Sequence, residues 1–360
     1  MTDAARPQFP NPWSRWLLGR SFRDQFYIPA PPSAAERAAF ALLERALAPR
    51  DLERVPIDRP IFIIGAPRSG TSMLYDLLTA HEEAAYVNHL MVKFPETPTA
   101  IEAVRKRLRL DVRGMRFLND SVSVSLGGAA EPFTHWGKWF GRDIDSLYWA
   151  PVARRDLGET KVREIRDDVR KVIATYGRKR PRFVLKFATV QPDVPLLQEI
   201  FPDAKFVNIV RDGRDVAHSL LKLNALSNVQ LERISHPLLK RIVPYPRVKR
   251  LAEYVERFGA DSIECTARVW RDTLDLIEGF RPKLAHYHEF RYEDLLADPD
   301  AELRRLFAFL EWSDPGSAEF RRLRAGIGRT SHANRYGERA KVESICGPTL
   351  ERYGYGTTRP

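Results

Sequence analysis

The chain has 360 residues, of which 44% are hydrophobic and 29% charged, so it can bury a sizeable core. These proportions exclude a disordered chain, a collagen and a small scaffold held together by disulfides. Lysine and arginine (58) outnumber aspartate and glutamate (47), and the net charge of +11 indicates an anionic partner: a nucleotide, a nucleic acid, a membrane surface or an acidic substrate.

The N-terminal part of the chain predicts an arm followed by a helix. Residues 1–32 hold prolines and aromatic residues, which indicate an arm or a packing segment. Residues 33–48 predict a helix with Ser33 as N-cap and Glu36 in the capping-box position, and Pro49 ends it. The first residues lack the apolar stretch of a secretory signal, and no uncharged apolar run approaches ~18 residues. We therefore expect a cytoplasmic protein without a membrane-spanning helix.

Apolar runs further along the chain predict the strands of one parallel sheet. Buried strands of this kind are short, apolar and rich in β-branched residues. The runs are residues 61–65, 84–90, 182–187, 205–210 and a stretch within 285–295. Helical patterns alternate with these runs, so we expect an α/β fold in three layers, with a central parallel sheet flanked by helices.

The strongest motif, GAPRSGTS at residues 65–72, lies between the first predicted strand and its helix. In this setting consecutive N–H groups turn inward and the helix N-terminus adds partial positive charge, which makes an anion-binding site. Gly65 lets the backbone approach the ligand, and Arg68 supplies a forked positive charge. The residues expected to hold the anion are Pro67, Arg68, Ser69, Gly70, Thr71 and Ser72.

The loop departs from the nucleoside-triphosphate pattern G-x4-G-K-[ST], although it predicts a fold of the P-loop type. Thr71 stands where that pattern has its lysine, and the positive charge has moved forward to Arg68. This departure argues against an enzyme that uses ATP or GTP. A P-loop kinase or another nucleotide-phosphate-binding protein remains the alternative function, and it would need a lysine at position 71 and an acidic metal ligand.

A second motif follows the predicted strand at 205–210. Arg211 lies at the carboxyl end of that strand, where open α/β sheets bind ligands. Ser219 follows eight residues later on a predicted helix, among apolar neighbours such as Val216 and Leu220. A hydroxyl among apolar side chains requires a polar partner, which singles out Ser219 together with Arg211.

Together the two motifs resemble those of the sulfotransferases, whose donor is 3′-phosphoadenosine 5′-phosphosulfate (PAPS). PRSGTS resembles the 5′-phosphosulfate loop, in the arginine form found in protein-tyrosine sulfotransferases and many bacterial members. Arg211 and Ser219 match the spacing of the family's 3′-phosphate motif. The resemblance covers about residues 60–90 and 182–352. It implies in-line transfer of a sulfuryl group to an acceptor hydroxyl or amine, with Arg329 or Arg335 as a further donor contact.

The resemblance leaves the general base open. Lys186 stands where cytosolic members carry Lys-x-His; the lysine is kept and the histidine is not, and we expect Lys186 to assist the leaving group. His89 lies 21 positions after Arg68, as does the glutamate base of protein-tyrosine sulfotransferases. Glu131 and His135 are the alternatives, in a glycine- and aromatic-containing segment that suggests an acceptor-lining loop.

The resemblance also sets the expected domains. Residues 1–58 form an N-terminal arm and helix, and residues 59–360 form the sulfotransferase α/β domain. A less regular stretch at about 91–181 predicts a mainly helical insertion on the acceptor side. Trp136, Trp139, Trp149 and Trp270 could stack on adenine or a sugar, although packing in the core is the simpler expectation for each.

Several expectations concern partners. Neither Cys265 nor Cys346 belongs to a metal-binding pattern, so we expect two reduced thiols and no metal site. The chain shows no nucleic-acid-reading module. The acceptor class stays open between a small molecule, a glycan and a lipid. The arm and the basic stretches at 104–116 and 153–182 suggest peripheral contact with a membrane or a glycolipid.

Overall fold

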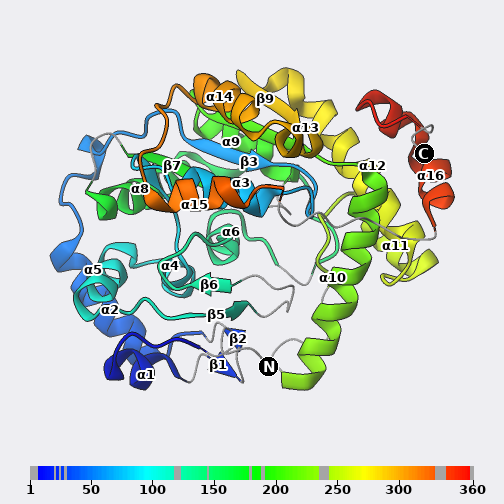
Figure 1. Ribbon diagram of the computed structural model, residues 1–360. Coiled ribbons are helices and arrows are strands. Elements are labelled where there is room, and N and C mark those ends of the chain that lie inside the picture. Colours follow the sequence, from blue (N-terminus) through cyan, green and yellow to red (C-terminus); the bar gives the residue numbers. More distant parts are fainter. Residues whose placement is uncertain are drawn as a thin grey trace.

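The computed structural model has a five-stranded parallel sheet at its centre, in the order β4-β7-β3-β8-β9 (Figure 1). These strands are β3 (Ile61–Ile64), β4 (Ala84–Ala85), β7 (Arg182–Lys186), β8 (Lys205–Val210) and β9 (His286–Arg291). The structure describes residues 7–19, 22–23, 26–27, 31–116, 123–143, 146–177, 181–187, 191–234, 243–328 and 338–356. The predicted strand at 205–210 is confirmed residue for residue.

Side chains of the central strand β3 alternate between the two faces of the sheet, as the pleat requires. Ile61 and Ile63 belong to one buried cluster, and Phe62 and Ile64 belong to the other. Because both faces are apolar, helices must cover both, and this confirms the predicted three-layer α/β fold.

The first face is covered by α3 (Thr71–Thr79), α14 (Pro299–Leu310) and α15 (Ala318–Gly326), whose apolar residues share a cluster with Ile61 and Ile63. The second face carries the larger cluster, which includes residues of α6, α8, α9, α10, α12 and α16. These helices are α6 (Phe133–Phe140), α8 (Glu159–Tyr176), α9 (Val194–Ile200), α10 (Gly213–Ile234), α12 (Ile263–Phe280) and α16 (Arg339–Arg352).

The remaining elements lie around these layers (Figure 1). The helices are α1 (Pro12–Leu18), α2 (Ala34–Leu47), α4 (His89–Lys93), α5 (Pro98–Leu108), α7 (Arg154–Leu157), α11 (Leu251–Phe258) and α13 (Tyr292–Ala297), with 3₁₀ turns at Leu52–Arg54, Gln191–Asp193 and Arg281–Lys283. A second sheet has the order β1-β2-β5-β6 and contains β1 (Phe22–Arg23), β2 (Phe26–Tyr27), β5 (Arg113–Arg116) and β6 (Ser123–Ser125).

The second sheet joins the N-terminal arm to the segment at about 91–181. Strand β2 of the arm pairs in parallel with β5, with Phe26 opposite Met115. The arm therefore continues a sheet begun by that segment, which the sequence patterns did not predict. The division of the chain into an arm, an α/β domain and an insertion stays a prediction.

A local capping signal correctly placed the start of α2. The Ser33 hydroxyl accepts from the Glu36 N–H (3.2 Å), and the Glu36 carboxylate accepts from the Ser33 N–H (2.7 Å), which confirms the predicted capping box. Helix α14 has a similar cap, because the Asp298 carboxylate accepts from the Ala301 N–H (2.9 Å). Pro299 occupies the first helical position of α14.

The strand predicted at 84–90 is too long, and this changes the setting of His89. Strand β4 ends at Ala85, because the Asn88 side chain caps a new helix by accepting from the N–H groups of Leu90 (3.1 Å) and Met91 (2.9 Å). His89 is consequently the first residue of α4 and not the end of a strand.

The four tryptophans discussed above, Trp136, Trp139, Trp149 and Trp270, are all buried in the core. Cys265 and Cys346 are buried free thiols, and burial raises the pKa of each to about 12. Within the described parts of the chain, no helix has the length and apolar character needed to cross a membrane. Over the same residues, no group of three or more metal-binding side chains is found.

Candidate active site

The glycine-containing loop connects β3 to α3 at the carboxyl edge of the sheet. Its turn depends on residues in the left-handed region, with φ of 126° at Gly65, 71° at Arg68 and 95° at Gly70. Gly70 is the N-cap of α3, and no side chain among the described residues caps this helix end. The first N–H groups of α3 are thus left for an anion, which fits a bound phosphosulfate.

The structure brings the two predicted donor motifs into direct contact. Arg68 Nε donates to Ser219 Oγ over 3.0 Å, although the two residues are 151 positions apart. Arg211 Nη1 donates to the Arg68 carbonyl oxygen over 3.3 Å, and its Nη2 lies 3.4 Å from the Asp215 carboxylate. Arg211 Nε is buried and has no partner among the described residues. Both guanidinium groups therefore lie at one site, and Arg211 Nε retains capacity for an anion.

Lys186 lies at the same edge, where β7 runs beside β3. It stands opposite Ile63 in the parallel register, and its ammonium group contacts both Ser72 Oγ (3.1 Å) and the Glu131 carboxylate. The Lys186 side chain is 5% exposed, whereas that of Glu131 is 36% exposed. A buried ammonium is thus paired with a carboxylate that solvent, and an incoming hydroxyl, can reach.

The other two candidates for the base lie in different settings. His89 is half-buried at the start of α4. His135 lies on α6, 1% exposed and with its ring edge-on to that of Trp139, and neither ring nitrogen has a partner among the described residues. Arg329 and Arg335 fall outside the described residues. The roles of all the predicted site residues stay predictions.

Burial lowers the pKa of His135 to about 3, with a smaller contribution from Lys138. The ordinary pKa of 6.5 applies in the unfolded chain, so at pH 5 the unfolded state binds a proton that the folded state does not bind. We expect this residue alone to cost about 2 kcal/mol of unfolding free energy between pH 7 and pH 5. Urea denaturation of His135→Leu should show that much less acid destabilisation than the native chain; equal pH dependence would contradict the assignment.

Tyr292 is a site residue that sequence analysis missed. It begins α13 directly after β9, and its ring faces the Arg211 guanidinium at 4.7 Å from the ring centroid. A Cβ atom at Gly70 would lie 2.6 Å from the same ring, so glycine is required there for packing as well as for its φ angle. The missed signal was an aromatic residue at the carboxyl end of a parallel strand.

We expect Tyr292→Ala to raise the KM for the donor about fivefold to tenfold while changing kcat little. The reason is that the ring holds Arg211 by a cation–π contact worth about 1–2 kcal/mol when partly desolvated. Initial rates at varied donor concentration measure the effect. Tyr292→Phe keeps the ring and should behave like the native chain; if Tyr292→Phe raised KM as much as alanine does, the stacking explanation would be wrong.

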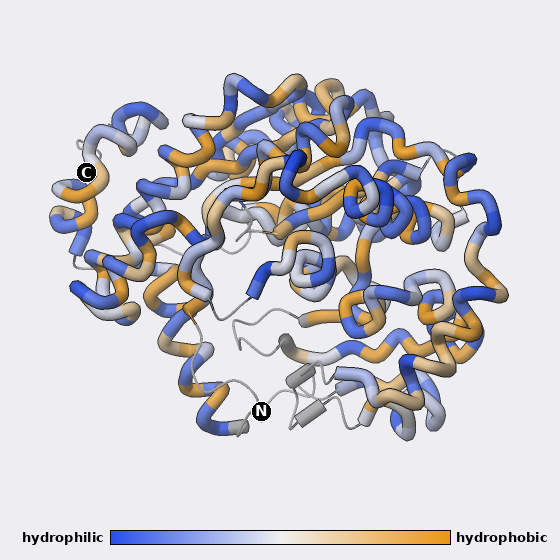
Figure 2. Tube along the Cα trace, turned by 180° about the vertical axis from the view of Figure 1, so that it is seen from behind, coloured by the Kyte–Doolittle hydropathy of each residue, from blue (hydrophilic) through white to orange (hydrophobic). Residues whose placement is uncertain are grey.

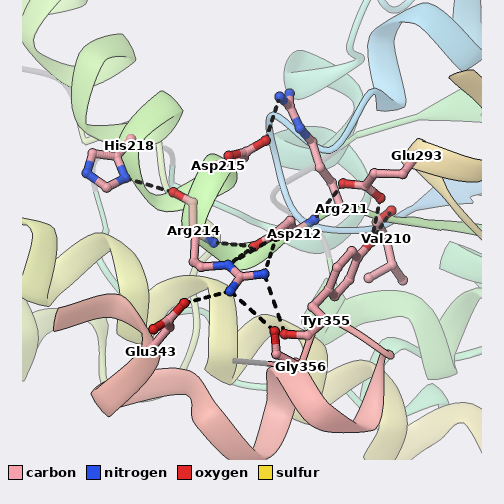
Figure 3. A network of polar contacts seen from close by, with 10 residues as sticks. All are labelled: Val210, Arg211, Asp212, Arg214, Asp215, His218, Glu293, Glu343, Tyr355 and Gly356. Atoms are coloured by element: carbon pink, nitrogen blue, oxygen red, sulfur yellow. Dashed lines mark hydrogen bonds and ion pairs between the residues drawn. The ribbon is translucent and has the colours of Figure 1, made fainter. Parts of the chain in front are cut away.

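The C-terminal part of the chain contacts the segment that follows β8 (Figure 3). The Arg214 side chain is 2% exposed. Its guanidinium donates to the Asp212 carboxylate through Nε and Nη2 and also contacts Glu343 of α16 (2.6 Å). Glu293 accepts from the Asp212 N–H (3.1 Å) and from the Tyr355 hydroxyl (2.7 Å). These contacts fix the backbone that directly follows Arg211.

The fold and this site define an α/β protein of the P-loop type with two arginine-containing anion sites at one edge of its sheet. The model of the Sulfotransferase family matches residues 60–315, and the chain belongs to this family. It is therefore a sulfotransferase, which uses PAPS as the sulfuryl donor, and the P-loop kinase alternative does not apply.

Particular relatives agree with this assignment. The chain is 28% identical over 332 residues to the omega-hydroxy-beta-dihydromenaquinone-9 sulfotransferases of Mycobacterium bovis and Mycobacterium tuberculosis, and the match covers 86% of this chain and 79% of the relative. A crystal structure of a sulfotransferase from Mycobacterium avium matches 96% of this chain and 86% of its own, with a TM-score of 0.50 and 15% identity. This likeness shows the shared fold.

Proposed function

We propose that this sulfotransferase acts on the hydroxyl of an apolar, lipid-like alcohol and that Glu131 is the general base. The observation that carries the choice of base is the contact between Lys186, Ser72 and Glu131, because it fixes a solvent-accessible carboxylate beside the phosphosulfate loop. His135 is a weaker candidate, since burial holds its pKa at about 3 and its ring is 1% exposed.

Two observations support an apolar alcohol as acceptor. Phe133 lies two residues after Glu131 at the start of α6 and is 37% exposed, so a solvent-accessible aromatic ring follows closely after the proposed base in the chain. The mycobacterial relatives, 28% identical, are named for an acceptor with an omega-hydroxyl group on a menaquinone. A terminal hydroxyl on a long apolar chain fits both.

In the proposed reaction the acceptor oxygen attacks the sulfur in line with the bridging oxygen of the donor. The new S–O bond forms as the bond to the bridging oxygen breaks, and 3′,5′-adenosine bisphosphate leaves. Glu131 takes the proton of the acceptor hydroxyl. Lys186, Arg68 and the N–H groups at the start of α3 stabilise the negative charge that develops on the leaving phosphate. Arg211 and Ser219 hold the 3′-phosphate.

The acceptor class is tested with ³⁵S-labelled PAPS and three acceptors: a long-chain primary alcohol, a simple phenol and a monosaccharide. We expect a labelled sulfate ester of the long-chain alcohol, with the highest kcat/KM of the three. Phe133→Ser should raise the KM for the long-chain alcohol and leave that for a short-chain alcohol unchanged. A preference for the phenol or the sugar would refute the proposed acceptor while leaving the sulfotransferase activity intact.

A further inference from the structure

Exposed apolar side chains gather on three neighbouring helices at the N-terminal end of the molecule. Among the described residues, nine large hydrophobic side chains are exposed, and six of them lie on α1, α2 and α5. We call these six the N-terminal apolar surface: Trp13, Trp16, Leu42, Leu43, Leu47 and Leu108. Trp16 is 75% and Leu42 69% exposed, so this surface is open to solvent in the single chain.

The three helices form one corner of the molecule, at the lower left of Figure 1. The Asn11 side chain, which caps α1, donates to the carbonyl oxygens of Leu108 and Arg109 at the end of α5 (3.1 Å each). Helix α2 is tied to the start of α5 by the buried Glu44 carboxylate, which accepts from the Ala100 N–H (2.7 Å). These contacts hold α1 and α2 against α5, so the exposed side chains of the three helices belong to one surface.

Helix α2 is unusual for a helix of a globular protein, because it leaves apolar residues exposed around most of its circumference. Glu44 is its only buried residue, and it buries this carboxylate rather than its leucines. The two tryptophans of α1 lie side by side, with ring centroids 6.4 Å apart. Tryptophan and leucine in this arrangement are typical of surfaces that lie at a membrane–water interface.

Positive charges are interspersed with the apolar residues. Arg15 lies between the two tryptophans in sequence, Arg45 lies between Leu43 and Leu47, and Arg107 and Arg109 flank Leu108; all four arginines are exposed. The view from behind shows hydrophobic and hydrophilic residues mixed along this part of the chain, at the lower right (Figure 2). The surface thus combines insertion of aromatic rings with attraction to negative head groups.

We propose that the N-terminal apolar surface binds the face of an anionic lipid bilayer. A two-fold contact between two copies of this chain is the less favourable occupant, because an isologous interface would bring the arginines of both copies together. A bilayer with anionic head groups matches the apolar and the positive parts of the surface at once. The proposal does not require the lipid-like acceptor, although it would bring the enzyme to an acceptor dissolved in the membrane.

Sedimentation with lipid vesicles tests the proposal without measuring enzyme activity. We expect the chain to sediment with vesicles of phosphatidylcholine and phosphatidylglycerol, to stay in solution with phosphatidylcholine alone, and to be released by high salt. The double variant Trp13→Ser/Trp16→Ser should weaken the partition by about tenfold or more. Arg15→Glu/Arg45→Glu should weaken it on anionic vesicles as well.

Val229→Ser is the matched control, because Val229 is 59% exposed but lies on α10. We expect it to bind vesicles as the native chain does. The thermal midpoint of each variant should stay near the native value, since the altered side chains are exposed, so lost binding would not reflect unfolding. Native binding by the tryptophan variant would overturn the proposal, as would a concentration-dependent dimer that this variant abolishes.

Discussion

Replacing Arg68 with alanine is expected to lower kcat by about 10²–10³ while leaving the fold intact. Arg68 is half-buried in the loop that precedes α3, and its Nε already holds Ser219 of the second donor motif. Loss of a preorganised positive group that stabilises charge in a transition state typically costs this factor. Initial-rate measurements at saturating donor give kcat, and circular dichroism at rising temperature gives the stability.

Two further variants separate charge from backbone strain at this position. Arg68 has a φ of 71°, which glycine adopts without steric cost, so Arg68→Gly should be more stable than Arg68→Ala by about 1 kcal/mol. Both should be equally inactive if the guanidinium is what matters. Arg68→Lys keeps a charge but loses the fork, and we expect it to be intermediate. Native turnover by the alanine variant would remove Arg68 from the reaction.

Local signals in the sequence were sufficient for much of the fold. The strand at 205–210 could be predicted because apolar, mostly β-branched residues dominate it, and the cap at Ser33 because it depends on a neighbour three residues away. The error at 84–90 has the same origin. Asn88 is a typical N-cap residue, but the apolar residues around it predict a strand that continues past it.

Contacts between distant segments could not be predicted. The ring of Tyr292 fills the space beside Gly70, more than 200 positions away, and the amide of Gln191 donates to the Gly65 carbonyl oxygen over 2.6 Å. The pairing of β2 with β5 likewise joins two segments that show no strong strand pattern. Such contacts depend on the order of strands in the sheets, which periodicity does not encode.

The site lies between these two cases. The two motifs single out Arg68, Arg211 and Ser219, whose roles in binding the donor stay predictions. Because parallel strands end at one edge of a sheet, the segments that follow β3 and β8 lie close together. The same rule places Lys186 at this edge. It does not place Glu131, which comes from a segment outside the central sheet, so the partner of Lys186 emerged only from the structure.

We expect Glu131→Gln to lower kcat by about 10²–10⁴ and to leave the affinity for 3′,5′-adenosine bisphosphate unchanged. The amide keeps the shape of the side chain and an oxygen that can accept from Lys186, but it cannot take up the proton of the acceptor. Discontinuous assays with labelled donor, quenched at fixed times, measure kcat. Isothermal titration calorimetry measures the affinity for 3′,5′-adenosine bisphosphate. His89→Gln is the matched control, and we expect it to keep most of the native kcat.

The choice of glutamine also distinguishes a base from a positioning residue. If Glu131 only orients Lys186, the retained hydrogen bond should preserve turnover in Glu131→Gln, whereas Glu131→Ala would lose it. If Glu131 accepts the proton, both variants should be inactive to a similar degree. A large loss in His89→Gln with native turnover in Glu131→Gln would instead assign the base to the first residue of α4.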